Sequence, residues 1–250
     1  MILARISRAI REQNWFAVAL EFVIVIAGVV IGFQVTEYAS ARTEAEQRAI
    51  VIDRLHDEVE SAISILVLIT DRYEELNTAR TELIELILAD ADLDRLDTDI
   101  NRTAAASTRF LPAFSPQQGV YTEIVSSGML SSLGDTPFRE ALGDYQASVI
   151  FLQDQIGNYL MMSTTRASIA DFDYVRMVYV PGNRREGRSV IDWEAASNDP
   201  EFLQFLLAGQ NQMLAIGLWW QGALESARAL CAETGRLTER PCEPPPAPAY

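Results

Sequence analysis

The chain has 250 residues, a formal net charge of -15 and an apolar content of 49%. This length allows one domain of ordinary size together with a membrane segment, and the apolar content is sufficient for a buried core. The acidic balance argues against nucleic-acid binding, and against binding of anionic lipid by the main domain, because both require basic surfaces.

An apolar segment near the N-terminus predicts a single transmembrane helix over residues 14–36. Between Trp15 and Val35 only Glu21 and Gln34 are polar. At about 1.5 Å per residue, such a helix covers roughly 30 Å, which is the thickness of one hydrocarbon layer. We therefore expect an integral membrane protein with one span.

Basic residues before this segment predict its orientation. Arg5, Arg8 and Arg11 lie within residues 1–13, and an excess of Lys and Arg marks the cytoplasmic side of a span. We expect a cytoplasmic segment over 1–13 and export of the remainder, although two arginines after the span partly offset the asymmetry. The alternative is a signal peptide cleaved after the sequence Ala-Ser-Ala at 39–41, which would also export the rest of the chain.

One face of the predicted span combines a carboxylate with small residues. Glu21, Val25, Gly28, Gly32 and Val35 lie within about 40° of one line on a helix. The G-x-x-x-G spacing of the two glycines favours close approach of another helix, and a carboxylate at this depth would be paired or protonated. We predict that Glu21, Val25, Gly28 and Gly32 pack against a second copy or a partner membrane helix. The alternative is that Glu21 reaches headgroups or water.

The segment after the span predicts a long core helix. Residues from Thr36 to about Asp99 include no Gly or Pro, and apolar residues recur at alternating steps of three and four. The stretch AISILVLI at 62–69 is apolar nearly all round, which indicates burial on several sides in a bundle. The recurring positions are Ile52, Leu55, Val59, Ala62, Leu66, Ile69, Tyr73, Leu76, Leu83 and Ile87, with Arg80 in the one polar position.

Further helices follow along the chain. We predict a loop over 101–116, a short helix over 117–127, and a long helix that starts at the capped turn Asp135-Thr136-Pro137 and ends before Pro181. A basic loop then leads to a helix that starts at Asn198-Asp199-Pro200. The fold class is therefore all-α, with an up-and-down bundle over residues 37–236 and a Pro-rich tail over 237–250.

Few residues indicate chemistry. Cys231 and Cys242 are the two cysteines, and in an exported domain we expect a disulfide that pins the tail to the last helix; the alternative is two free thiols. His56 and Glu60 are spaced as a metal-binding pair, but we expect a solvated or stalk-facing histidine. We predict no catalytic, cofactor or metal site.

An acidic run and a sequon also call for interpretation. Asp90, Asp92 and Asp94 match the opening of a calcium loop, whereas Arg95 replaces its glycine and Asn101 its bidentate glutamate. We expect a solvated helix end, with calcium binding as the alternative. Asn101 also begins an N-x-T glycosylation sequon.

Two blocks resemble an uncharacterised family of bacterial proteins that have one N-terminal membrane helix and a helical extracytoplasmic domain. The first block has Glu21, the G-x-x-x-G pair and then Gln34 within NWFAVALEFVIVIAGVVIGFQV. The second block, VYTEIVSSGMLSSLGDTPFREALGDYQAS, matches at a Tyr and at Ser127, Gly128, Leu130, Asp135, Phe138, Arg139, Leu142 and Tyr145, although Phe138 replaces a more usual Leu. The resemblance implies a bacterial inner-membrane protein with a cytoplasmic N-terminus and a periplasmic domain, and it implies no reaction.

Together these features predict a membrane-anchored extracytoplasmic interaction or scaffold module without catalysis. The alternative is a periplasmic small-ligand sensor that signals through membrane partners. Such a sensor would use a pocket between helices, which we expect near Trp193, Trp219 and Trp220.

Overall fold

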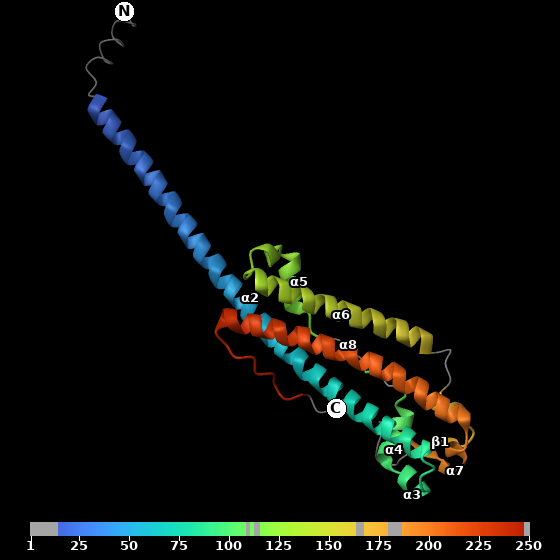
Figure 1. The fold of residues 1–250 in the computed structure, drawn as a ribbon. Helices are drawn as coiled ribbons and strands as arrows, with labels where there is room; N and C mark the ends of the chain where they lie inside the picture. Colours follow the sequence, from blue (N-terminus) through green and yellow to red (C-terminus); the bar gives the residue numbers. More distant parts are fainter. Residues whose placement is uncertain (1–14, 109–110, 113–115, 164–167, 180–186, 248–250) are drawn as a thin grey trace, which may run out of the picture. The chain divides into compact units, whose positions relative to one another are not determined.

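The structure is a computed structural model that describes residues 15–108, 111–112, 116–163, 168–179 and 187–247. It confirms the all-α class, with one small two-stranded sheet as the exception (Figure 1). The predicted orientation depends on arginines within residues 1–14, which lie outside the described residues. The elements are α2 (Trp15–Leu88), α3 (Leu93–Leu96), α4 (Asp99–Ala106), α5 (Gly119–Ser126), η1 (Met129–Ser131), α6 (Thr136–Ser163), η2 (Ile169–Asp171), β1 (Val175–Tyr179), β2 (Gly187–Ile191), α7 (Trp193–Ser197) and α8 (Pro200–Thr238).

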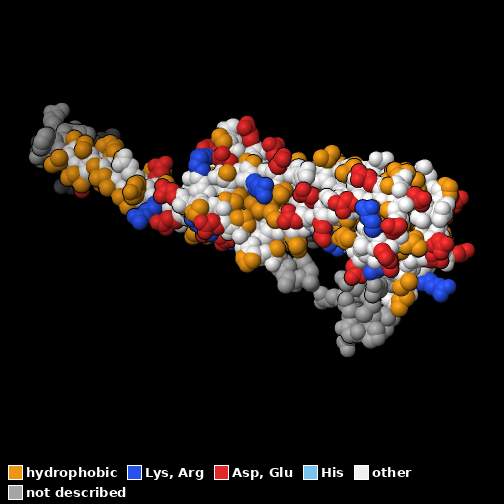
Figure 2. All heavy atoms as spheres, turned by 60° about the horizontal axis from the view of Figure 1, so that its bottom comes forward, with side chains coloured by type: hydrophobic (Ala, Val, Ile, Leu, Met, Phe, Trp, Pro, Cys, Tyr) orange, Lys and Arg blue, Asp and Glu red, His pale blue; other side chains and the backbone are white. Residues whose placement is uncertain are grey.

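The N-terminal compact unit, Met1–Val51, contains the first part of α2. Among the described residues, one helix is long and apolar enough to cross a membrane, and the apolar stretch that qualifies it has no residue buried within the protein. Phe22 and Phe33 are 65% and 69% exposed. On the face shown in Figure 2, hydrophobic side chains cover this part of α2, whereas acidic side chains are spread over the other unit.

The second compact unit, Ile52–Tyr250, is a helical bundle built around the rest of α2. Figure 1 shows α6 beside α8, and hydrogen bonds join α8 to α2 at Asn77. Every apolar position of the predicted seam from Ile52 to Ile87 is buried, as is Arg80 in its polar position. The recurrence of apolar residues in the sequence therefore marks the buried face of α2 correctly.

Local signals locate three helix boundaries. Asp199 accepts a hydrogen bond from the backbone N–H of Glu201 at 2.8 Å and caps α8, as the Asn-Asp-Pro sequence predicts. Asp135 accepts from the backbone N–H of Phe138 at the start of α6. Gly128 follows α5 with φ +72°, a conformation that favours glycine.

The predicted long helix from 136 to about 180 is wrong over residues 168–179. α6 ends at Ser163, and β1 pairs with β2 as an antiparallel hairpin with Val175 opposite Ile191. Val175 and Ile191 enter a hydrophobic core cluster, the hairpin core, that also includes Trp193 and Phe202. β-Branched residues favour this pairing once a partner strand and a core are available, and neither is visible in a local helical pattern.

The predicted loop over 101–116 is also wrong in part, because α4 occupies Asp99–Ala106. The Thr98 hydroxyl accepts a hydrogen bond from the backbone N–H of Asn101 at 3.2 Å and caps this helix. Thr98 and the alanines at 104–106 are the signals for α4 in the sequence.

Candidate functional site

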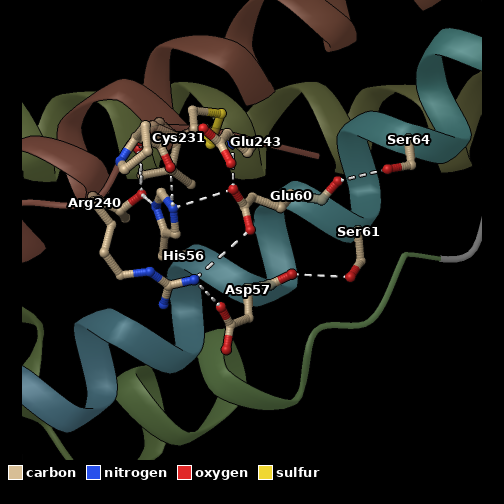
Figure 3. Close-up of a disulfide and its surroundings, with 12 residues drawn as sticks. His56, Asp57, Glu60, Ser61, Ser64, Cys231, Arg240 and Glu243 are labelled. Carbon is tan, nitrogen blue, oxygen red and sulfur yellow. Dashed lines mark hydrogen bonds and ion pairs between the residues drawn. A yellow bond between two sulfur atoms is a disulfide. The ribbon is translucent and has the colours of Figure 1, made fainter. Parts of the chain in front are cut away.

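The C-terminal strap, residues 240–245, lies along one face of α2 (Figure 3). The backbone N–H of Glu243 donates to Glu60 Oε1 at 2.5 Å, and Ser64 Oγ donates to the carbonyl of Pro245 at 2.6 Å. The carbonyl of Pro241 lies 3.2 Å from His56 Nε2. The strap therefore contacts α2 at His56, Glu60 and Ser64, which are four residues apart.

The regular spacing has a simple geometric cause. Contacts advance by two residues in the strap for every four in α2. Two residues of extended, proline-rich chain advance about 6.2 Å, and four helical residues advance about 6.0 Å. An extended proline-rich segment thus stays in register with successive turns of α2.

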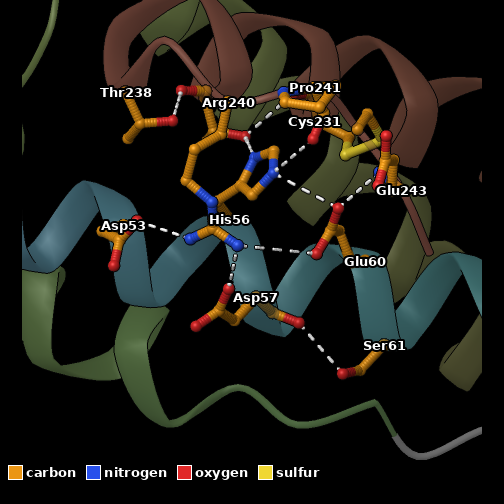
Figure 4. Close-up of polar contacts among 12 residues, drawn as sticks. Asp53, His56, Asp57, Glu60, Ser61, Cys231, Thr238, Arg240, Pro241 and Glu243 are labelled. Atoms are coloured by element: carbon orange, nitrogen blue, oxygen red, sulfur yellow. Dashed lines mark hydrogen bonds and ion pairs between the residues drawn. A yellow bond between two sulfur atoms is a disulfide. The ribbon is translucent and has the colours of Figure 1, made fainter. Parts of the chain in front are cut away.

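His56 and Glu60 form the buried centre of this contact (Figure 4). His56 is fully buried, and its Nε2 lies 3.3 Å from Glu60 Oε1. Both neighbours of Nε2, the Pro241 carbonyl and the Glu60 carboxylate, only accept hydrogen bonds, so Nε2 bears a proton. Nδ1 lies 2.8 Å from the hydroxyl of Thr234 on α8. Of the two expected positions of His56, exposure to solvent is wrong, because three separate segments enclose this ring.

Arg240 begins the strap and pairs with two acidic residues of α2. Its guanidinium donates to Asp53 and, at 2.8 Å, to Asp57 (Figure 4). These carboxylates raise the pKa of Arg240 above its ordinary value. Because the group is exposed, its pairs set the position of the strap more than they stabilise the fold.

The end of α8 turns the chain sharply into the strap. Glu239 adopts the left-handed conformation with φ 56°, and the backbone N–H of Arg240 donates to the Gly235 carbonyl at 3.0 Å. A Cβ atom on Gly235 would lie 2.5 Å from the Arg240 carbonyl oxygen and 3.5 Å from His56 Cε1. The return of the chain over His56 therefore requires glycine at position 235.

A disulfide joins Cys231 on α8 to Cys242 in the strap, with the two Cα atoms 5.8 Å apart (Figure 3). It lies beside the buried pair: donor atoms of His56, Glu60 and Cys231 all lie within 4.8 Å of one another. In the disulfide form Cys231 offers no thiolate, so only the histidine and the glutamate could contact a metal ion.

A groove of about 280 Å³ lies between α2 and α8. Its polar lining includes Asn77 and Gln210, and both of these side chains accept hydrogen bonds from buried Arg80, at 2.9 Å and 3.3 Å. Leu214 and Leu218 form an apolar, exposed part of its wall. The groove thus offers amide groups backed by a buried cation, next to an apolar surface.

The three tryptophans do not themselves line this groove, but Leu218 and Gln221, which flank Trp219 and Trp220 in the sequence, belong to its wall. Trp193 belongs to the hairpin core and donates a hydrogen bond from Nε1 to Asp97 at 3.0 Å. Trp220 is fully buried, and its ring centroid lies 6.3 Å from that of Tyr73, a residue of the groove wall. Trp219 packs edge-on against Phe151 of α6. The two adjacent tryptophans thus face different neighbours, as we expect for neighbours on a helix.

The acidic run at 90–94 and the sequon at Asn101 differ in their exposure to solvent. Asp90, Asp92 and Asp94 are exposed. Asn101 is buried, and its side-chain nitrogen donates to the carbonyls of Arg95 and Leu96 at 3.0 Å and 3.1 Å. Asn101 therefore closes the turn between α3 and α4, and both hydrogens of its amide are used within the fold.

The predicted packing face of the span lies in the exposed part of α2. Glu21 and Val25 are exposed, and a Cβ atom on Gly28 or on Gly32 would have nothing within 4 Å. The chain's own described residues therefore leave space next to both glycines.

The second block of the family resemblance falls where α5, α6 and the end of α8 meet. Phe138, Leu142 and Tyr145 are buried on α6. Asp135 accepts hydrogen bonds from Arg236 of α8 at 2.7 Å and 2.8 Å, and this guanidinium lowers the pKa of Asp135. These residues have roles in packing and in helix capping.

Comparisons with known proteins leave the site to be interpreted from its geometry. No protein-family model, no curated protein and no solved structure shows a significant match to this chain. The strap and the groove were missed by sequence reasoning. A run of prolines after Arg240 and the paired amides at 77 and 210 are the signals that could have indicated them.

Proposed function

We propose that this protein is a membrane-anchored interaction module of the bacterial inner membrane, with a cytoplasmic N-terminus, a periplasmic helical domain and no catalytic role. The observation that supports it best is the apolar part of α2, in which side chains from Leu20 to Val35 are exposed over the whole circumference of the helix. Such a surface is stable against lipid or against other membrane helices.

The disulfide and the acidic surface are consistent with this proposal. Disulfides persist in exported domains, and the net charge of -15 keeps a domain soluble beside a membrane. The bundle offers a broad surface for a partner, and the face of Glu21, Val25, Gly28 and Gly32 offers a second contact within the membrane.

A pair of reporter fusions tests the topology. We expect alkaline phosphatase fused after residue 250 to be active, and a fluorescent protein that matures only in the cytoplasm to stay dark at the same position. Resistance of the protein to extraction with alkaline carbonate would support integral insertion. A fluorescent fusion with an inactive phosphatase, or full release by carbonate, would contradict the proposal.

A small-ligand sensor is the second candidate, and the groove between α2 and α8 favours it. A side chain added at Gly217 would enter this groove, because its Cβ would lie 3.7 Å from Asn77 Nδ2 and 4.0 Å from Tyr73 Cδ1. A Cβ at Gly222, on the same helix, would meet nothing within 4 Å.

Native mass spectrometry of protein extracted gently from its membrane tests this second function. We expect a small molecule to remain bound to the wild type and to Gly222→Leu, but to be lost from Gly217→Leu. A wild type without any bound molecule, or equal occupancy in both variants, would favour the interaction module alone.

A further inference from the structure

We infer that the reduced protein binds one Zn²⁺ ion between α2, α8 and the strap, with His56, Glu60, Cys231 and Cys242 as its four ligands. This inference does not depend on the proposed function. In the oxidised protein the disulfide holds the strap on the bundle, and in the reduced protein the metal ion takes over that role.

The donor set and its dimensions match a structural zinc site. Such sites are tetrahedral and combine thiolates with histidine or carboxylate. With metal–ligand distances of about 2.0–2.1 Å, the nitrogen and oxygen ligands of a tetrahedral site lie about 3.3 Å apart. His56 Nε2 and Glu60 Oε1 are 3.3 Å apart, which is longer than a strong charge-assisted hydrogen bond of about 2.7–2.9 Å.

One sulfur lies close to this pair, and the second is bonded to the first. Cys231 is fully buried on α8, and its Sγ lies within 4.8 Å of the histidine and glutamate donor atoms. Cys242 is bonded to it and belongs to the strap, where it is exposed. After reduction, a shift of about 1–2 Å in the strap would give the separation of nearly 4 Å that two thiolates need around zinc.

The groups that would orient the ligands are already in place. A histidine that binds a metal through one nitrogen usually donates its other N–H to a fixed oxygen. His56 Nδ1 lies 2.8 Å from Thr234 Oγ1, and this hydroxyl lies 3.0 Å from the Cys231 carbonyl, to which it can donate. Glu60 Oε1 accepts from the backbone N–H of Glu243. Both non-sulfur ligands are thus held in position by neighbours of the two cysteines.

The chemical steps balance with an external dithiol as reductant. The dithiol breaks the Cys231–Cys242 bond through a mixed disulfide that forms most readily at exposed Cys242, and it leaves as a cyclic disulfide after giving two electrons and two protons. Zn²⁺ then displaces the two thiol protons. To bind through Nε2, His56 releases the proton of that nitrogen to solvent and takes one up on Nδ1, so that the neutral ring donates from Nδ1 to Thr234 Oγ1.

Metal titration of the full-length protein in detergent tests the inference. We expect the oxidised protein to bind no Zn²⁺ tightly, and the reduced protein to bind one equivalent in competition with a chromophoric chelator. His56→Gln and Glu60→Gln should each weaken binding to the reduced protein at least about tenfold. Glu82→Gln is the matched control, because Glu82 is an exposed carboxylate on the same helix and is none of the four ligands, and this variant should bind as the wild type does.

Zinc X-ray absorption of the reduced wild type makes the test independent of how well the variants fold. We expect two sulfur and two nitrogen or oxygen neighbours around the metal. Absence of binding after reduction, unchanged affinity in both glutamine variants, or a spectrum with sulfur neighbours alone would each overturn the inference.

Discussion

Arg80 is a buried cation whose hydrogen-bond acceptors are neutral groups. It is 1% exposed, and it donates to Asn77, Gln210, Ser107 and the Ala104 carbonyl. Burial lowers the pKa of Arg80 to about 10, so the side chain remains charged at neutral pH. One guanidinium thereby links α2, α4 and α8.

Removal of this side chain should strongly destabilise the bundle. Arg80→Ala removes a donor from one buried and three partly buried acceptors and creates a cavity, so we expect a loss of about 3 kcal/mol in the free energy of unfolding. Denaturant unfolding in detergent, followed by the fluorescence of buried Trp220, would measure it.

Arg72→Ala is the control on the same helix. Arg72 pairs with Glu75 at the surface, so its removal should cost less than about 0.5 kcal/mol. Equal losses for the two variants would show that the burial of Arg80 has no energetic consequence.

At the scale of elements, alanine substitutions at two glycines of α8 should change the free energy of unfolding in opposite directions. Gly235→Ala would force a Cβ against the carbonyl of Arg240, and we expect a loss of about 1–3 kcal/mol in the free energy of unfolding. Gly222→Ala enters open space on the same helix, and the higher helix propensity of alanine should stabilise the protein by up to about 1 kcal/mol. Thermal unfolding of both variants would reveal the difference in sign, and stabilisation by Gly235→Ala would show that the strap leaves its place easily.

The disulfide between α8 and the strap should also have a measurable effect. It closes a short loop with a sequence separation of 11, and the chain-entropy relation gives about 3 kcal/mol for its loss. We expect Cys242→Ser to lower the free energy of unfolding by that amount in metal-free buffer that contains a chelator. Wild-type protein with reductant in the same buffer should match the variant. An unchanged midpoint, together with two freely alkylated thiols in protein from its native membrane, would show that the cysteines are unpaired.

Elements with local signals could be predicted from the sequence, whereas elements that need a distant partner could not. The apolar seam of α2 and the caps at Asp135 and Asp199 lie within a few residues of what they determine. The strap depends on His56 and Glu60, and β1 depends on β2. The sequence over 175–179 continues a helical pattern when read locally, and the pairing of β1 with β2 overrides that pattern.

The residues of the candidate site also divide into pairs that have local signals and contacts that need a distant partner. The sequence indicated Cys231 with Cys242, and His56 with Glu60, as two separate pairs. Their meeting at one place depends on how α2, α8 and the strap pack together. Full burial of His56, for which solvation was one of two expectations, follows from that packing and from the turn at Gly235.

At the scale of the whole molecule, association through the proposed membrane span can be tested without disturbing the bundle. Gly28 and Gly32 have no neighbours within the described chain, so Gly28→Ile and Gly32→Ile should leave the monomer's stability unchanged. If a second helix packs here, we expect each to weaken association by about 1–2 kcal/mol, or roughly 5- to 30-fold. A membrane-association assay on the isolated span and crosslinking of the whole protein would measure the effect.

Val29→Ile is the matched control, since Val29 lies off the predicted face and is 67% exposed. Glu21→Gln should weaken association less than Glu21→Leu, because glutamine still forms hydrogen bonds. Unchanged association in both glycine variants would indicate that this face contacts lipid, with Glu21 reaching water at the headgroups.

The strap also sets the order in which the molecule can be completed during synthesis. His56 is 178 residues before Thr234, and Asp53 is 187 residues before Arg240. The apolar part of α2 leaves the ribosome long before these partners exist, so insertion into a membrane would precede closure of the bundle. Until the strap arrives, His56 and Glu60 remain hydrated on an open helix. Docking of the strap therefore follows synthesis of all that it contacts, and a nascent chain that stalls before residue 240 lacks the groups that cover His56 and Glu60.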